Sequence, residues 1–561
     1  MLYTLGLIGL CIAWLLPGHY FPWTNFQQDV LAAAGVGLIG LAAVVTGRTW
    51  PVRLPAISLI ALLMALVPLG QFAVGFLPYR LDAALSAAYL VAFAMSVVAG
   101  QQVAASSGRF TFALCCAIGA AAAASVGIGL IQWLQIGPYG FIESVAAGER
   151  VSGNLRQPNQ LASLFGLAVA ATLWAFETHR IRAWIAALAA TSFGFGIVMT
   201  QSRAGWLFIA IVVLFWAVYR KRVPLRTTGP ALATGVACFF GAVLAWDPLN
   251  AWVQSGARVE SLASRIQPGY RLQHWHTLWD ALMQVPWLGY GWLQVPRAQQ
   301  AAALDHPATF EFLSSSHNQL LDLLIWNGLP IGVLMIAALA WWAWSRMRAC
   351  SDPSAWAMLL ALSFLFAHSL VEFPLQYAYF LLPAGLMIGI VEAGMPATDE
   401  TKRGVRVGRL PYLTSLLAMS MLLVLIVSEY GKLEESVRRV RLAEVGYVQP
   451  GGEPTVPDIE LLDWQREYVR LFLTEPRREM SPQELQWISA IATRYPSPTA
   501  LMRLARSQAL NGQTANAERS LQILCRISME QHCDNGRKHW ATLAKDSAHM
   551  QQVRFPETPP R

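Results

Sequence analysis

Residues 54–72 read LPAISLIALLMALVPLGQF and contain no charged side chain. A bilayer hydrocarbon core about 30 Å thick needs an apolar helix of roughly 20 residues, so this stretch predicts a membrane span. Of the 561 residues in the chain, 55% are hydrophobic and 13% are charged, whereas a soluble domain has roughly 25% charged residues. The sequence therefore predicts an all-α protein, a polytopic bundle of transmembrane helices.

Similar apolar stretches recur along the chain and predict about 12 to 13 spans. The others lie at residues 3–17, 29–46, 82–103, 109–134, 159–177, 181–200, 203–219, 229–246, 319–345, 354–370, 375–393 and 411–429. The stretch at 319–345 contains Asn327, Gly328 and Pro330, so we expect a break in that helix. The first stretch lacks the basic region of a signal peptide and is predicted to be retained.

Lysine and arginine residues gather in alternate loops. These loops contain Arg48, Arg53, Arg109, Arg180, Arg182, Arg220, Lys221, Arg222, Arg226, Arg346, Arg348, Lys402, Arg403, Arg406 and Arg409. Because cytoplasmic loops carry an excess of these residues, the N-terminus is predicted to be cytoplasmic in a bacterial inner membrane. The long loop and the C-terminal tail are then periplasmic. The same clusters supply much of the net charge of +8, which requires no nucleic-acid partner.

Four regions follow from this pattern: N-terminal membrane helices (1–246), a periplasmic catalytic loop (247–318), C-terminal membrane helices (319–429) and a periplasmic helical domain (430–561). In the last region, ALMRLARSQALNGQTANAERSLQILCRI at 500–527 contains two amphipathic runs joined at Asn511-Gly512, as in a tetratricopeptide-like (TPR-like) hairpin. Such hairpins bind protein or cap a domain. Cys525 and Cys533 suit a disulfide in an oxidising compartment, and the sequence leaves that pairing open.

Two polar segments on the predicted periplasmic side combine cations with amides. One is ERVSGNLRQPN at 149–159, which includes Arg156, Gln157 and Asn159; it also fits an ordinary polar start of a helix. The other is Gln201-Ser202-Arg203, a tight turn between two spans. The planar guanidinium of Arg203 suits bidentate binding of phosphate. The alternative is that this arginine, at the start of a span, only extends its side chain to the lipid headgroups.

The long loop carries further cations, Arg258, Arg265 and Arg271. Arg271 begins the amphipathic segment RLQHWHTLWDALMQVPWLGYGW, whose tryptophans favour the bilayer interface over sugar stacking. His274 and His276 are predicted to lie on the surface of this helix.

His317 is the titratable residue predicted at the periplasmic mouth of the next span, beside Asn318. Histidine has an unperturbed pKa near neutrality and exchanges protons readily. Downstream, Glu372 and Tyr377 mark another periplasmic turn, where Glu372 is expected to pair with an arginine and hold it in place.

Four motifs together resemble the bacterial O-antigen ligase and polymerase superfamily, and within it the PglL-type pilin O-oligosaccharyltransferases. They are GNLRQPNQLA at 153–162, TQSRAGW at 200–206, SSSHNQLLDLLIWNGLPIG at 314–332 and VEFPLQYAYFLLPAGL at 371–386. The likeness covers residues from roughly 130 to 395. The tail of this chain also resembles the C-terminal region of that subgroup. The likeness implies a GT-C-like membrane fold.

The resemblance implies transfer of a glycan from undecaprenyl pyrophosphate to a serine or threonine of a pilin or another periplasmic protein. It assigns catalytic roles to His317, Asn318 and Gln157. It assigns pyrophosphate binding to arginines and support to nearby polar residues; these are Arg203, Arg271, Arg265 and Arg156, and Asn159, Glu372 and Tyr377. The family often has tyrosine where this chain has Phe373, so Tyr377 is expected to supply any role of that hydroxyl.

Transfer from a pyrophosphate leaving group needs positive charge that stabilises the departing anion and a base for the acceptor hydroxyl. Arginines and His317 provide both, so we predict a metal-independent enzyme without a cofactor. The rival interpretations are a lipopolysaccharide O-antigen ligase, an O-antigen polymerase, and a lipid-linked glycan flippase or other transporter. A transporter typically shows paired internal repeats, which this sequence lacks. A membrane-anchored helical scaffold leaves His317 and the arginines unexplained.

Overall fold

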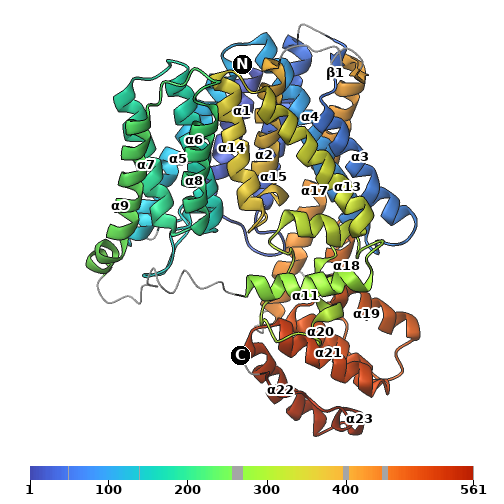
Figure 1. Cartoon of the computed structure of the whole chain (residues 1–561). Helices are drawn as coiled ribbons and strands as arrows, with labels where there is room; N and C mark the ends of the chain where they lie inside the picture. The colour runs from blue at the N-terminus through green and yellow to red at the C-terminus, as the bar shows by residue number, and fades with distance from the viewer. Residues whose placement is uncertain (48–49, 138, 255–269, 396–403, 445–452, 560–561) are drawn as a thin grey trace. The chain divides into compact units, whose positions relative to one another are not determined.

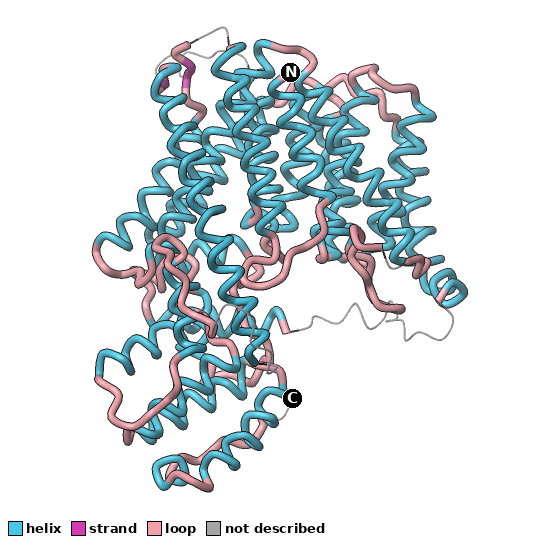
Figure 2. Tube along the Cα trace, turned by 180° about the vertical axis from the view of Figure 1, so that it is seen from behind, coloured by secondary structure: helices cyan, strands magenta, loops and turns pink. Residues whose placement is uncertain are grey.

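The computed structural model describes residues 1–47, 50–137, 139–254, 270–395, 404–444 and 453–559. The described chain is mostly helical (Figures 1 and 2), which confirms the predicted helical class. Within it, the strands β1 (Val52–Arg53) and β2 (Arg406–Val407) form a short antiparallel pair, with Val52 opposite Val407.

Contacts divide the chain into two compact units, each assembled from separate segments. The first unit contains Met1–Leu63, Ala88–Gln267 and Ala338–Leu423, and the second contains Met64–Ala87, Pro268–Ala337 and Val424–Arg561. These units follow contacts rather than sides of a membrane, so the four regions proposed from the sequence remain a prediction.

The first unit is a bundle of apolar helices around α6 (Pro158–Glu177). Its other complete helices are α1 (Leu2–Leu15), α2 (Phe26–Thr46), α5 (Phe110–Trp133), α7 (Ala183–Thr200), α8 (Arg203–Tyr219), α9 (Gly229–Val253), α14 (Pro353–Ser369) and α15 (Ala378–Gly394). Helix α6 packs against α5, α7, α8 and α14 and buries Leu161, Leu164 and Phe165 completely. Pro158 occupies its first turn, because no backbone donor is needed there.

Helices α3 (Ala56–Ala73), α4 (Arg80–Ser106), α13 (Gln319–Ala349) and α17 (Arg409–Glu444) contribute residues to both units. Among the described residues, nine helices are long and apolar enough to cross a membrane. The apolar helices α1, α8, α14 and α15 are shorter. Each predicted stretch is therefore helical, and nine reach the full length, as expected of a multi-pass membrane protein.

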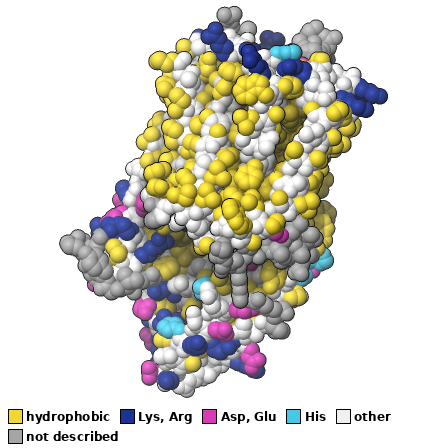
Figure 3. Space-filling model, turned by 90° about the vertical axis from the view of Figure 1, so that its left-hand side faces the viewer, with side chains coloured by type: hydrophobic (Ala, Val, Ile, Leu, Met, Phe, Trp, Pro, Cys, Tyr) yellow, Lys and Arg dark blue, Asp and Glu magenta, His cyan; other side chains and the backbone are white. Residues whose placement is uncertain are grey.

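Exposed apolar side chains on these helices include Leu188, Leu214 and Leu244. Figure 3 shows hydrophobic side chains spread over a broad area of the face in view, with few lysine and arginine side chains among them. A continuous apolar surface of this kind is unusual for a protein surrounded by water and suits contact with lipid.

The second unit contains α11 (Arg271–Gln284), α12 (Val295–Ala302) and the helices of the tail. The tail helices are α18 (Asp463–Leu473), α19 (Pro482–Arg494), α20 (Pro498–Leu510), α21 (Thr514–Ile527), α22 (Glu530–Ala544) and α23 (Ala548–Gln551). Helices α20 and α21 lie side by side (Figure 1) and are joined at Asn511-Gly512. Cys525 and Cys533 form the disulfide that the sequence left open.

Helix α13 breaks at Gly328, as its sequence predicts. Gly328 has φ 72° and ψ 175°, a conformation essentially restricted to glycine. A Cβ at this position would collide with the backbone carbonyl of Trp287. At the break, the N–H of Leu329 donates to Pro286 O at 2.7 Å, a carbonyl outside its own helix. The chain after α11 therefore packs tightly against the break.

Candidate active site

His317 lies in a short loop immediately before α13, in the second unit. Its backbone φ is 56°, in the left-handed region that a residue with a Cβ keeps only when its surroundings hold it. Asn318 caps α13, since its Oδ1 accepts from the N–H groups of Leu320 and Leu321 at 3.0 and 3.3 Å. His317 is therefore held at the mouth of an apolar helix.

The loop is shaped by Asp322, whose side chain is fully buried. Its carboxylate accepts from Ser315 Oγ at 2.6 Å and from the N–H of Ser316 at 2.8 Å. Trp275 in α11 donates from Nε1 to Ser316 O at 2.9 Å. The carboxylate also interacts electrostatically with His317.

Asp322 was missed as a candidate by the sequence analysis. The available signal was a lone carboxylate inside an apolar helix, which is costly unless it has a partner or a function. Its serine partners are only six and seven residues away, but the reversal of the chain before α13 is what brings them onto it.

His274 is buried rather than on the helix surface, so that prediction was wrong; its side chain is 3% exposed. It lies on the same face of α11 as Leu278 and Leu282, both completely buried. Burial, followed by the positive charges of His317 and Arg271, lowers the pKa of His274 to about 4. His274 is therefore neutral at pH 7, whereas His276 is exposed as predicted.

Arg271 is the first residue of α11 and is half-buried. Arg271 and His317 both lie within electrostatic range of His274. Arg258 and Arg265 lie outside the described residues.

The remaining candidates belong to the first unit, where Asn159 connects separate segments. Its Oδ1 accepts from Arg150 Nη2 at 2.9 Å and from Ser202 Oγ at 2.8 Å, and its Nδ2 donates to Glu372 Oε1 at 2.9 Å. Arg150 also donates from Nε to Thr200 O at 2.9 Å. The amide of Asn159 thus connects Arg150 with Glu372, and the expected pairing of Glu372 with an arginine stays a prediction.

Gln157 is the N-cap of α6, and its Oε1 accepts from the N–H of Asn159 at 2.5 Å. Arg203 begins α8 directly after this network and is exposed. Tyr377 precedes α15, is half-buried, and stacks on Tyr379 with ring centroids 5.2 Å apart. The structure thus brings Gln157, Asn159 and Glu372 together and places Arg203 next to Ser202 of the same network.

Arg156 faces an open cleft of about 500 Å³ in this unit. It donates to His19 O at 3.0 Å and lies 3.5 Å from Glu143. Arg150 and Gln201 also line the cleft. Sequence analysis did not assign Arg150 a role, because its partners Thr200 and Asn159 are brought to it only by the fold.

Among the described residues, no group of three or more His, Cys, Asp or Glu side chains is arranged to hold a metal ion. In the second unit, the described residues offer the imidazole of His317, in a loop whose preceding serines are bound by Asp322. In the first unit, Arg150 and Arg156 line a cleft together with Glu143, Glu149 and Gln201. An imidazole can transfer protons, and arginines can bind a phosphorylated ligand.

Three family models match this chain. A model described as O-antigen ligase matches residues 185–336, one described as protein glycosylation ligase matches residues 151–176, and one described as the C-terminal part of a virulence factor membrane-bound polymerase matches residues 356–530. The first two ranges contain Gln157, Arg203 and His317.

The chain is also similar to two proteins of Acinetobacter baylyi. It is 28% identical to a general O-oligosaccharyltransferase over 545 residues, covering 94% of this chain and 92% of that protein. It is 26% identical to a ComP-specific O-oligosaccharyltransferase over 266 residues, covering 47% and 48% of the two chains.

These matches confirm the resemblance drawn from the motifs. The chain is similar to the O-antigen ligases and, among them, to PglL-type protein O-oligosaccharyltransferases. The comparisons support a glycosyltransferase that functions in protein O-glycosylation.

Proposed function

We propose that this chain transfers a glycan en bloc from undecaprenyl pyrophosphate to a serine or threonine of a pilin or another periplasmic protein. The observation that carries the proposal is the loop of His317, held in a left-handed conformation by the buried Asp322. A similarity that extends over 94% of the chain supports the protein acceptor.

In this mechanism, the acceptor hydroxyl oxygen attacks the anomeric carbon of the glycan. The bond from that carbon to the pyrophosphate oxygen breaks, and His317 takes the hydroxyl proton. Asn318, Gln157 and Asn159 fix the geometry of the reacting groups. Arg203, Arg271, Arg265 and Arg156 stabilise the charge of the departing pyrophosphate, as fixed cations do best where water is excluded. We propose that no metal ion takes part.

In the proposed orientation, the N-terminus is in the cytoplasm and the tail and the His317 loop are in the periplasm of a bacterial inner membrane. The distribution of lysine and arginine supports it. In the first unit, Arg180 and Arg182 precede α7, and Arg220, Lys221 and Arg222 follow α8. The turn that contains Arg203 lies at the opposite ends of these two helices.

The tail in this proposal is a TPR-like domain that receives the acceptor protein. The antiparallel contact of α20 with α21, joined by a tight turn with Gly512 at φ 76°, supports it. Two of the family models are named for an O-antigen ligase and a polymerase, so they support a second candidate function, transfer of the glycan to a saccharide acceptor.

Replacing Arg203 by alanine is expected to lower kcat/KM for the lipid-linked donor by about 10- to 100-fold, the effect of losing a hydrogen bond between charged groups. Lysine should restore only part of this, because it lacks the planar fork of arginine. Arg182→Ala is the matched control, since Arg182 lies at the other end of α7. Equal kinetics of the wild type, Arg203→Lys and Arg203→Ala would contradict pyrophosphate binding by Arg203.

A further inference from the structure

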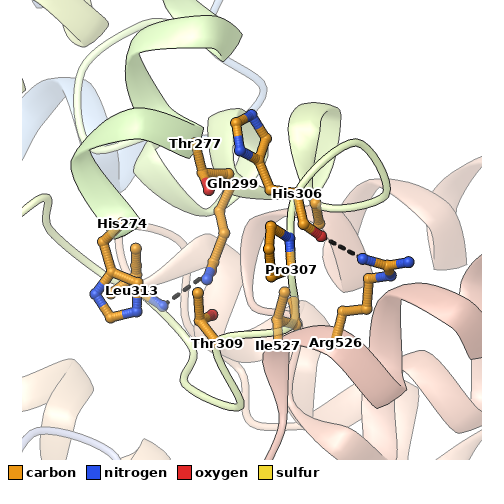
Figure 4. A pocket seen from close by; sticks show the side chains of 10 residues that line it. His274, Thr277, Gln299, His306, Pro307, Thr309, Leu313, Arg526 and Ile527 are labelled. Carbon is orange, nitrogen blue, oxygen red and sulfur yellow. Dashed lines mark hydrogen bonds between the residues drawn. The ribbon is translucent and has the colours of Figure 1, made fainter. Parts of the chain in front are cut away.

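Residues 303–310 form the segment that leads into the His317 loop, and this segment contacts the tail at the end of α21. The N–H groups of Thr309 and Phe310 both donate to Arg526 O, at 3.1 and 2.9 Å. In return, the Arg526 guanidinium donates to the carbonyl of His306 (Figure 4). Residue 526 therefore binds this segment through both its backbone and its side chain.

The Cys525–Cys533 disulfide fixes the position of Arg526, because it joins the end of α21, next to this arginine, to α22. Cys525 and Cys533 are almost completely buried, and they pack with Ile527, Leu524 and Ala303 in one apolar cluster. Ala303 belongs to the segment itself. The disulfide thus joins α21 to α22 directly beside Arg526 and packs against the start of this segment.

The opposite side of the same segment is held by α11. His306 Nε2 lies 2.9 Å from Asp280 Oδ2, and Gln273 donates from Nε2 to Pro307 O at 2.8 Å. The space left between α11, α12 and the tail is a crevice of about 10 Å³, lined by His274, Thr309 and Arg526 among others (Figure 4). That volume holds about one water molecule, so the segment is packed closely on both sides.

The support continues along the chain to the histidine. Gln299 of α12 accepts from the N–H of Leu313 at 3.0 Å and donates to Glu311 O at 2.8 Å. Ser315 and Ser316 are bound by Asp322 and Trp275. From Thr309 to His317, hydrogen bonds tie this stretch to Arg526, α12, α11 and α13 in turn.

We propose that Arg526 and the Cys525–Cys533 disulfide are positioning elements for His317. The tail then acts on the catalytic loop itself, in addition to any role in receiving the acceptor. This inference rests on the proposed function of His317 as the base. A base displaced by about 1 Å loses up to about 100-fold in rate, so a brace this close to the loop affects turnover more than donor affinity.

The test compares Arg526→Ala and the double variant Cys525→Ser/Cys533→Ser with Arg519→Ala, an exposed arginine on the same helix. Hydrogen exchange is measured on the amides of Thr309, Phe310 and residues 314–318 in the full-length protein. Glycan transfer is measured on the same preparations. We expect about tenfold faster exchange in the first two variants, a kcat lowered by about tenfold or more, and an unchanged donor KM.

Exchange and kcat equal to those of Arg519→Ala would overturn the proposal. Faster exchange with unchanged kcat would overturn it too, because the contact would then hold the segment without positioning His317. Arg526→Ala keeps the disulfide, so it remains informative if the cysteine variant does not fold. If the wild type transfers no glycan, the proposed function fails, whereas the exchange comparison still decides whether Arg526 braces the loop.

Discussion

The variant His317→Ala is expected to lose about 10²- to 10⁴-fold in glycan transfer, the range that general-base catalysis contributes. Expression and membrane insertion should be unchanged, since His317 is half-buried in a loop whose other contacts are made by Ser315, Ser316 and Asp322. Turnover is measured with purified protein and lipid-linked donor.

The matched control is His276→Ala, because His276 is an exposed histidine in the same unit. It should retain wild-type turnover. Near-normal turnover of His317→Ala would show that His317 is not the base, and equal losses in the two variants would point to a general effect on folding.

The variant Arg494→Ala is expected to destabilise the second unit by about 3 to 5 kcal/mol, the cost of leaving a buried charge unpaired. Arg494 in α19 donates to both oxygens of Asp82 at 2.7 and 2.6 Å, and Asp82 is 1% exposed. Gln294 donates to the same carboxylate at 2.8 Å, so the charge keeps one partner in the variant. Thermal unfolding in detergent measures the loss.

Adding Asp82→Asn to Arg494→Ala should recover most of the stability, because the uncompensated charge is removed while an acceptor for Gln294 remains. The surface control is Arg477→Ala, which breaks the more exposed pair with Glu484 and should change the unfolding temperature little. If Arg494→Ala unfolds at the wild-type temperature, the ion pair does not stabilise this unit.

The helices and their breaks were predictable because they depend on local sequence. Span length follows from uninterrupted apolar runs such as 54–72, and the break in α13 follows from Gly328 and Pro330. The buried state of His274 was also encoded, since it is spaced four residues before Leu278 on the buried stripe of α11. The polarity of the imidazole favoured the surface, whereas that spacing places His274 on the buried stripe.

Contacts between distant segments could not be predicted in this way. Asn159 meets Glu372 across 213 residues, and Thr309 meets Arg526 across more than 200. Both contacts depend on tertiary packing, which leaves no periodic pattern in one sequence. Residue types therefore indicated His317, Arg203 and Glu372 as candidates, whereas Arg150, Asp322 and Arg526 emerge from the hydrogen bonds of the folded chain.

The central claim is that this chain moves a lipid-linked glycan onto protein. It is tested by reconstituting the purified protein with undecaprenyl-pyrophosphate-linked glycan and offering a pilin and a lipopolysaccharide core acceptor in the same reaction, with and without EDTA. We expect glycan on a serine or threonine of the pilin, at the same rate in EDTA and with release of undecaprenyl pyrophosphate. Glycan found only on the saccharide acceptor, or transfer that is lost in EDTA and restored by a divalent cation, would contradict it.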